Sequence, residues 1–379
     1  MQKRLSLSFF SSDDPALPFP EIGETISRQG SSIEEQQKIN FGLVKFYSKL
    51  FCLAAIVASI VGSIVLLVPD ENDYSQASVL KHERLAQLPS PKIVLVGGSN
   101  LAFGVDSQQI EQALDCQVVN MGMNGWLGIR FMLEEVRGTL KAGDTVVLSF
   151  EWDNFFKPVE GHGPSFLGIV KTNPGALSFL TIEQLKSLLV AFSEVAQEKT
   201  ERLIKQALTS AGIRKQEPSA REQRGAFLNT IEALEGFSPH GDLVSHLSVE
   251  TPLPFPLGQD LIQKGTPVEK KAIEMMVEFA KEVTSRKIHV LVSYPPIPPD
   301  VFQRHSESFN DIHRVLSLQE ELSIPRPPTE FVFDRENFFD TIYHLNRYGR
   351  PVRTQKMIED LSINSSCSSL LPRQEIGRS

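Results

Sequence analysis

The segment Pro91-Lys-Ile-Val-Leu-Val-Gly-Gly-Ser-Asn100 indicates the architecture of the whole chain. Its short apolar run ends at two glycines, the pattern of a buried parallel strand, and the glycines give the backbone the freedom to turn sharply. Ligands of open α/β sheets bind at the carboxyl ends of the strands, so Ser99 stands where a nucleophile would be useful. The same residues are compatible with an ordinary turn whose serine hydroxyl caps the next helix.

Strand and helix patterns alternate downstream of this segment. Apolar runs predict strands at 93–96, 116–121, 145–150, 289–293 and 330–333, and helical periodicity marks 108–114, 129–140, 269–286, 306–322 and 350–361. This alternation predicts an α/β fold, a three-layer flavodoxin-like parallel sheet of about five strands. The alternation stops between residues 157 and 265, a segment that we interpret as a helical insertion or cap over the sheet.

An uncharged run of 19 residues, Leu50 to Val68, precedes the α/β pattern. About 20 apolar residues cross a bilayer as a helix; a buried helix of a soluble protein is the alternative. Lysines precede the run and acidic residues follow it, so the N-terminus should be cytoplasmic. The run also begins too far from Met1 for an ordinary cleaved signal peptide. We expect an uncleaved signal anchor, a single pass through a bacterial inner membrane, with the α/β domain periplasmic or extracellular.

The domain organisation follows from these patterns. We expect a cytoplasmic, mostly disordered tail, a transmembrane signal anchor, a spacer, an α/β domain in two pieces with the insertion between them, and a disordered end, because the two tails offer little apolar surface to bury. The cytoplasmic tail is residues 1–44, the anchor 45–69 and the spacer 70–90. The two pieces of the α/β domain are 91–156 and 266–362, the insertion between them is 157–265, and the disordered end is 363–379.

Composition excludes several classes of protein. The chain has 379 residues, 41% of them hydrophobic, which suits a globular core, and its net charge of −8 argues against a nucleic-acid partner. Cys52, Cys116 and Cys367 form no metal-ligand pair and imply no disulfide framework. The histidines lack metal-ligand spacing. The glycines after the first strand match neither a phosphate loop nor a dinucleotide fingerprint. We therefore expect no metal, cofactor or nucleotide.

The residues able to do chemistry follow the ends of predicted strands. They are Ser99, the segment 120–125, Asp153, Asn154, Asp340 and His344. These ends share one edge of a parallel sheet, so the residues should converge there. Serine needs a neighbouring base, histidine suits that role, and a carboxylate orients the base. Asp340 lies near His344, and Asp334 is a rival partner for it.

Three segments resemble the SGNH (GDSL-like) hydrolase superfamily, most of all its membrane-anchored bacterial cell-envelope members. They are Val96-Gly-Gly-Ser-Asn100, Val119-Asn-Met-Gly-Met-Asn-Gly125 and Phe339-Asp-Thr-Ile-Tyr-His-Leu-Asn346, within residues 91–361. The resemblance implies a Ser-His-Asp triad of Ser99, His344 and Asp340. It also implies an oxyanion hole made by the amides of Ser99 and Gly125, with the side chain of Asn154. We expect Asn100, Asn124 and Trp152 to contact substrate, although Trp126 and Trp152 would equally suit a packed core.

The chain departs from the family pattern in two places, and these departures leave two hypotheses of function. The third block is usually Gly-x-Asn-Asp and here reads Glu151-Trp-Asp-Asn154, and three residues instead of two separate Asp340 from His344. The resemblance implies a serine-dependent acyl esterase or O-acyltransferase that acts on a cell-envelope carbohydrate or acylated polymer, with an acyltransferase or export protein as its partner. The departures motivate the alternative, a catalytically impaired SGNH-like envelope protein that binds glycan or a polymer-export partner.

Overall fold

The computed structural model of the chain describes residues 22–70, 74–213, 217, 219–250, 253 and 266–367, with the backbone alone for 22–39. The chain divides into two compact units, Met1–Ile60 and Val61–Ser379. The sheet and the candidate active site belong to the second unit.

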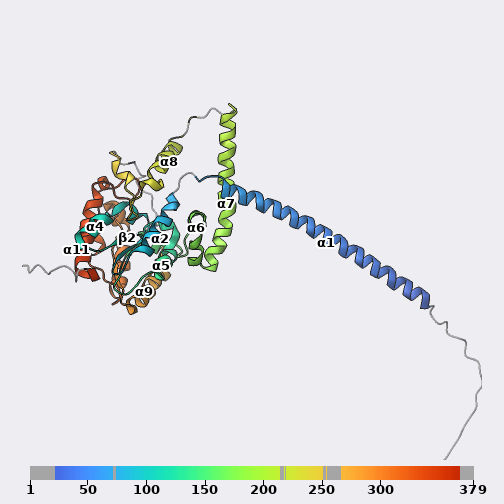
Figure 1. The fold of residues 1–379 in the computed structure, drawn as a ribbon, viewed down its shortest axis with the longest axis horizontal. Coiled ribbons are helices and arrows are strands. Elements are labelled where there is room, and N and C mark those ends of the chain that lie inside the picture. Colours follow the sequence, from blue (N-terminus) through green and yellow to red (C-terminus); the bar gives the residue numbers. More distant parts are fainter. Residues whose placement is uncertain are drawn as a thin grey trace, which may run out of the picture. The chain divides into compact units, whose positions relative to one another are not determined.

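One or more helices follow each described strand, and four described α-helices stand in succession between β3 and β4 (Figure 1). In chain order the α-helices and strands are α1 (Ile22–Leu67), α2 (Ala77–Gln87), β1 (Ile93–Gly97), α3 (Ser99–Gly104), α4 (Ser107–Leu114), β2 (Val118–Asn120), α5 (Gly128–Arg137), β3 (Thr145–Ser149), α6 (Gly163–Thr172), α7 (Ile182–Ser210), α8 (Ala220–Ile231), α9 (Lys270–Ser285), β4 (His289–Val292), α10 (Pro299–Ser317) and α11 (Gly349–Asn364).

The four strands form one parallel sheet in the order β2-β1-β3-β4. Ile93 of β1 is in register with Val118 of β2 and with Thr145 of β3, and Thr145 pairs in turn with His289 of β4. The α/β class and the first four predicted strands are confirmed, with ends that differ by a residue or two. The carboxyl ends of these strands meet at one edge of the sheet, which places the loops after β1, β2 and β3 side by side.

The predicted fifth strand, 330–333, is wrong. Residues Pro328–Phe331 form a 3₁₀ helix instead, and the segment keeps one isolated parallel bridge between Val332 and Ile297. Ile297 stands between pairs of prolines in the run from Tyr294 to Pro299. Prolines have no N–H to donate, so this run offers too few donors to pair with a regular strand.

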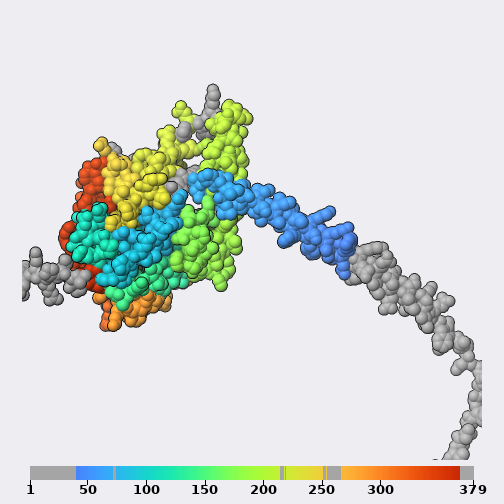
Figure 2. Space-filling model, in the orientation of Figure 1, coloured from blue at the N-terminus to red at the C-terminus, as the bar shows by residue number. Residues whose placement is uncertain are grey.

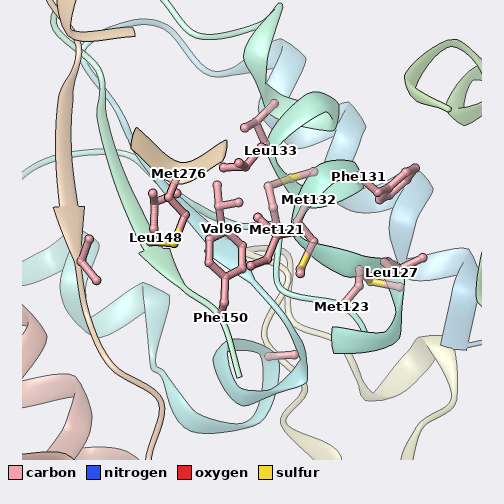
Figure 3. Packing of buried hydrophobic residues seen from close by; sticks show 14 of the residues in the cluster. Val96, Met121, Met123, Leu127, Phe131, Met132, Leu133, Leu148, Phe150 and Met276 are labelled. Carbon is pink, nitrogen blue, oxygen red and sulfur yellow. The ribbon is translucent and has the colours of Figure 1, made fainter. Parts of the chain in front are cut away.

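Helices cover both faces of the sheet because successive strand residues point to opposite sides. Val94 and Val96 of β1 belong to a cluster with side chains of α5 and α9, and Figure 3 shows Val96 and Leu148 packed against Met132 and Met276. Ile93 and Leu95 belong to a second cluster with side chains of α4 and α11. The strands read as continuous apolar runs because neither face is open to water.

One helix among the described residues is long and apolar enough to cross a membrane. It is the part of α1 from Asn40 to Leu67, in which an 18-residue window has a mean hydropathy of 2.8. The predicted membrane helix is thus supported in length and composition. Helix α1 begins at Ile22, inside the segment 1–44 assigned to a tail, whereas residues 1–21 lie outside the described residues.

The segment between β3 and α9 is helical where the structure describes it, as the insertion was expected to be. Thr181 begins α7 with a capping box, in which its hydroxyl accepts from the amide of Gln184 and the Gln184 side chain accepts from the amide of Thr181. Figure 2 shows the side chains of α6 and α7 in contact along the two helices. Capping boxes satisfy donors that a helix start otherwise leaves unpaired.

A disulfide joins Cys116, at the start of the β2 region, to Cys367, just after α11. The sequence implied no such pair, because 251 positions separate the two cysteines and a spacing of that kind carries no signal. Cys52 is free and exposed.

Candidate active site

Ser99 is the first residue of α3 and follows β1 through Gly97 and Gly98. A side chain at Gly97 would overlap the carbonyl of Ser149 on β3, and one at Gly98 would overlap the carboxyl group of Glu151. Gly98 has a φ of −89°, which any residue adopts. The glycines are therefore required for close approach and not, as the sequence suggested, for backbone freedom.

Ser99, His344 and Asp340 meet in one hydrogen-bonded chain. The Nε2 atom of His344 lies 2.8 Å from the hydroxyl oxygen of Ser99. Its Nδ1 atom lies 2.7 Å from a carboxylate oxygen of Asp340. The additional residue between the aspartate and the histidine does not prevent their contact. The rival Asp334 is exposed and precedes a separate 3₁₀ helix, so Asp340 is the partner of His344.

The imidazole of His344 is held in place on its face as well as at its nitrogens. The ring of Phe103, one helical turn after Ser99, stacks on it with centroids 3.8 Å apart and planes 4° from parallel. Burial lowers the pKa of His344, but Asp340, with Glu232 and Glu151, outweighs it and raises the pKa above its usual value. The surroundings thus favour the imidazolium that would form when a serine gives up its proton.

Glu151 directly follows the end of β3 and reaches the same place. One of its oxygens accepts a hydrogen bond from the amide of Asn100 at 3.1 Å and lies 3.4 Å from the Ser99 hydroxyl. The other oxygen is buried and has no hydrogen-bond partner among the described residues. Burial, followed by the nearby charge of Asp153, raises the pKa of Glu151.

The residues expected to form an oxyanion hole divide into two groups. Ser99 and Gly125 both line the cavity described below. The side-chain amide of Asn154 instead donates to the carbonyl of Gly125 at 2.8 Å, and Asn154 is absent from the described cavity lining. Asn154 therefore holds the loop after β2 against the loop after β3, and Glu151 takes the position beside Ser99.

Of the three residues expected to contact substrate, one lines the cavity and two are buried. Asn124 lines the cavity, where its side-chain oxygen accepts from the amide of Trp126. Asn100 is buried and bonded to Ser149 and Arg353. Trp152 is buried, stacked 4.1 Å from Phe309 and 5.0 Å from Tyr294. The last two expectations are corrected, since a side chain bonded or stacked within the core cannot meet a ligand.

The triad opens into a cavity of about 710 Å³. Its described lining carries the carboxyl groups of Glu151, Asp153, Glu198 and Glu232, and no lysine or arginine. Trp126, 52% exposed, lines the same cavity, and the ammonium of Lys157, which is paired with Asp153, lies 3.7 Å from the centre of its ring. Side chains of α6 and α7 complete the wall, so the helical segment after β3 contributes to the site. No group of three or more potential metal ligands occurs among the described residues.

Sequence reasoning missed three contributors to this site. Glu151 carries a usable signal, because it follows a strand end at the same edge as Ser99, although comparison with the family pattern marks it only as a departure. Phe103 lies four residues after Ser99, on the same helical face, which is a usable signal once α3 is known. Glu232 directly follows α8 and has no pattern that marks it.

The comparisons with known proteins leave the site to be interpreted from its own geometry. The chain matches no model of a known protein family and has no significant match among curated proteins.

Proposed function

We propose that the chain is a serine-dependent acyl esterase or O-acyltransferase of the SGNH (GDSL-like) type that acts on a cell-envelope carbohydrate or polymer. The observation that carries the proposal is the chain of contacts from Ser99 through His344 to Asp340, at 2.8 and 2.7 Å. A nucleophile, a base and an orienting carboxylate within hydrogen-bond reach, beside a cavity, form the geometry required for acyl transfer.

The proposed reaction has two halves. The Ser99 oxygen attacks the ester carbonyl while His344 accepts the serine proton, and the tetrahedral intermediate collapses to an acyl-serine as His344 returns that proton to the leaving alcohol. Water or an acceptor hydroxyl then attacks the acyl-serine, again through His344, and releases the acyl group as an acid or as a new ester. Asp340 holds the imidazole in the tautomer that these steps need. The backbone amides of Ser99 and Gly125 are the proposed oxyanion donors.

Several observations support the substrate class and the cell location. An exposed tryptophan in a cavity is suited to contact with a sugar, and the carboxylates of the described lining, of which only Asp153 is paired with Lys157, disfavour anionic ligands. Disulfides such as Cys116–Cys367 persist in oxidising compartments, in keeping with a domain outside the cytoplasm behind a membrane helix. The strand order β2-β1-β3-β4 equals the first four strands of the flavodoxin-like order.

An active-site probe tests this function against the alternative of an impaired, glycan-binding envelope protein. The full chain in detergent is treated with a fluorophosphonate and assayed on p-nitrophenyl acetate, beside Ser99→Ala. Labelling and hydrolysis that vanish in S99A support the enzyme. Folded protein that neither labels nor hydrolyses rejects the enzyme and favours the binding protein, for which glycan binding is then measured. The position of Glu151 against Ser99 is the observation that favours this alternative, because an ionised carboxylate there would repel the oxyanion.

A further inference from the structure

We propose that Glu151 is a further catalytic residue, a neutral carboxylic acid that donates a hydrogen bond to the oxyanion formed during attack by Ser99. This inference rests on the proposed function and adds to it a side-chain donor that the sequence pattern had assigned to Asn154.

The positions of the two carboxyl oxygens of Glu151 carry the proposal. One accepts from the Asn100 amide and therefore acts as the carbonyl oxygen of an acid. The other would carry the proton, and it is buried without a partner among the described residues. This second oxygen lies against the backbone of Gly98 and Gly125, since a Cβ built on either glycine would overlap it. A buried hydroxyl without an acceptor, on the carboxyl group whose other oxygen lies 3.4 Å from the Ser99 hydroxyl, is placed to find one when negative charge develops on the substrate.

The expected donor is engaged elsewhere. The Asn154 side chain donates to the carbonyl of Gly125, and Asn154 is absent from the described cavity lining. Glu151 does line the cavity, together with Ser99 and Gly125. Of the two side chains from the end of β3, Glu151 is the one within reach of the reacting atoms.

The surrounding charges decide the protonation of Glu151. Burial and the charge of Asp153 raise its pKa, whereas the Asn100 hydrogen bond and the charge of His344 act in the opposite direction, and the net shift is upward. Arg353 on α11, whose own pKa burial lowers to about 9, interacts with the charge of Glu151 and, as a cation, acts in the same direction as His344. Tyr74 and Tyr343 are buried nearby, and burial together with the charge of Glu151 raises the pKa of each phenol, so both stay neutral. Glu151 thus stands in surroundings that favour the neutral acid.

The proposal has a defined pH signature. Attack by Ser99 needs His344 neutral, so activity rises with pH through the pKa of His344. Donation by Glu151 needs the protonated acid, so activity falls as pH rises through the pKa of Glu151, where a carboxylate would repel the oxyanion. The pH profile of kcat/KM is therefore bell-shaped, and its alkaline limb belongs to Glu151.

The test compares Glu151→Gln and Glu151→Ala with the wild-type full chain, on p-nitrophenyl acetate between about pH 5 and 10. Glutamine keeps a donor that does not titrate, so E151Q should retain activity within about tenfold and lose the alkaline limb, whereas E151A should lose about 100- to 1,000-fold in kcat. Glu135→Gln is the matched control, a carboxyl equally buried at 3% exposure, with a pKa raised to about 8, outside the described cavity lining. E135Q should keep both the activity and the limb, and thermal unfolding verifies that each variant is folded.

The outcomes separate the two proposals. An active wild type without an alkaline limb, an E151Q that keeps that limb, or an E151A as active as the wild type overturns the role of Glu151 and leaves the triad intact. If both variants fail to fold, the pH profile of the wild type still tests the role of Glu151, because the proposal requires the alkaline limb. A wild type that is inactive and unlabelled by fluorophosphonate across the range overturns the proposed function, and the Glu151 proposal with it.

Discussion

Replacement of Asp340 by Asn tests whether the Asp340 carboxylate orients His344 or only packs beside it. The carboxylate lies 2.7 Å from Nδ1 of His344, and the two side chains are only 5% and 8% exposed, so water has little access to replace the lost bond. The amide is nearly isosteric, but its NH₂ group would favour the imidazole tautomer with its proton on Nε2, which cannot take the proton of Ser99. We expect kcat to fall about 10³- to 10⁴-fold, equivalent to about 4–5.5 kcal/mol of transition-state stabilisation.

The assay follows p-nitrophenyl acetate hydrolysis against pH, with Asp334→Asn as the matched control on the same segment. Asp340 is the leading contributor that raises the pKa of His344, so the residual D340N activity should have its acid limb at lower pH than the wild type. D334N should match the wild type, because its carboxylate is exposed and outside the triad. A D340N variant within about tenfold of the wild type, or a D334N variant that loses as much, would refute the orienting role.

Three further predictions concern the disulfide, the membrane helix and the cavity. Cys116→Ser should destabilise the folded chain by about 2–5 kcal/mol in thermal or denaturant unfolding, and C52S should not; equal stabilities would show that the bridge does not form. Alkaline phosphatase fused after Ser379 should be active in a bacterial host, because α1 would place that end outside the cytoplasm; an inactive fusion beside an active cytoplasmic reporter would reverse the orientation. Trp126→Ala should raise KM for an acylated glycan and spare kcat on p-nitrophenyl acetate, whereas an unchanged KM would remove Trp126 from the binding surface.

The strands were predictable because their environment leaves a simple mark on the sequence. A parallel strand buried on both faces must be apolar throughout, and β1 and β3 are uncharged runs that end in small or polar residues. The segment 330–333 has three apolar residues after Glu330, yet a strand also needs a partner with free donors. Its neighbour carries prolines on both sides of Ile297, and this pairing relation, which spans some 35 positions, cannot be read from either segment alone.

The triad was predictable only in part, since parallel topology places Ser99 after β1 at the sheet edge but no described strand leads to His344. The two residues are 245 positions apart and meet at 2.8 Å, although the segment before His344 keeps only the isolated bridge between Val332 and Ile297. Burial was not predictable in the same way. Trp152 follows a strand end as Ser99 does, but the 3₁₀ helix that it begins turns its ring toward Phe309 in the core. A residue that follows a strand has its backbone at the sheet edge, but the conformation of the following turn determines the direction of its side chain.

The same local turn explains why the block Glu151-Trp-Asp-Asn154 misleads when it is compared letter by letter. A 3₁₀ helix has three residues per turn, so Glu151 and Asn154 lie on one side of it, joined by a hydrogen bond from the Asn154 amide to the Glu151 carbonyl at 3.0 Å. Both side chains consequently reach Gly125, one at its carbonyl and the other along its Cα. The residue nearer the strand also reaches Ser99, and there only the small Gly98 leaves room for a carboxyl group. The glycine before the nucleophile and the glutamate after β3 are thus complementary parts of one site.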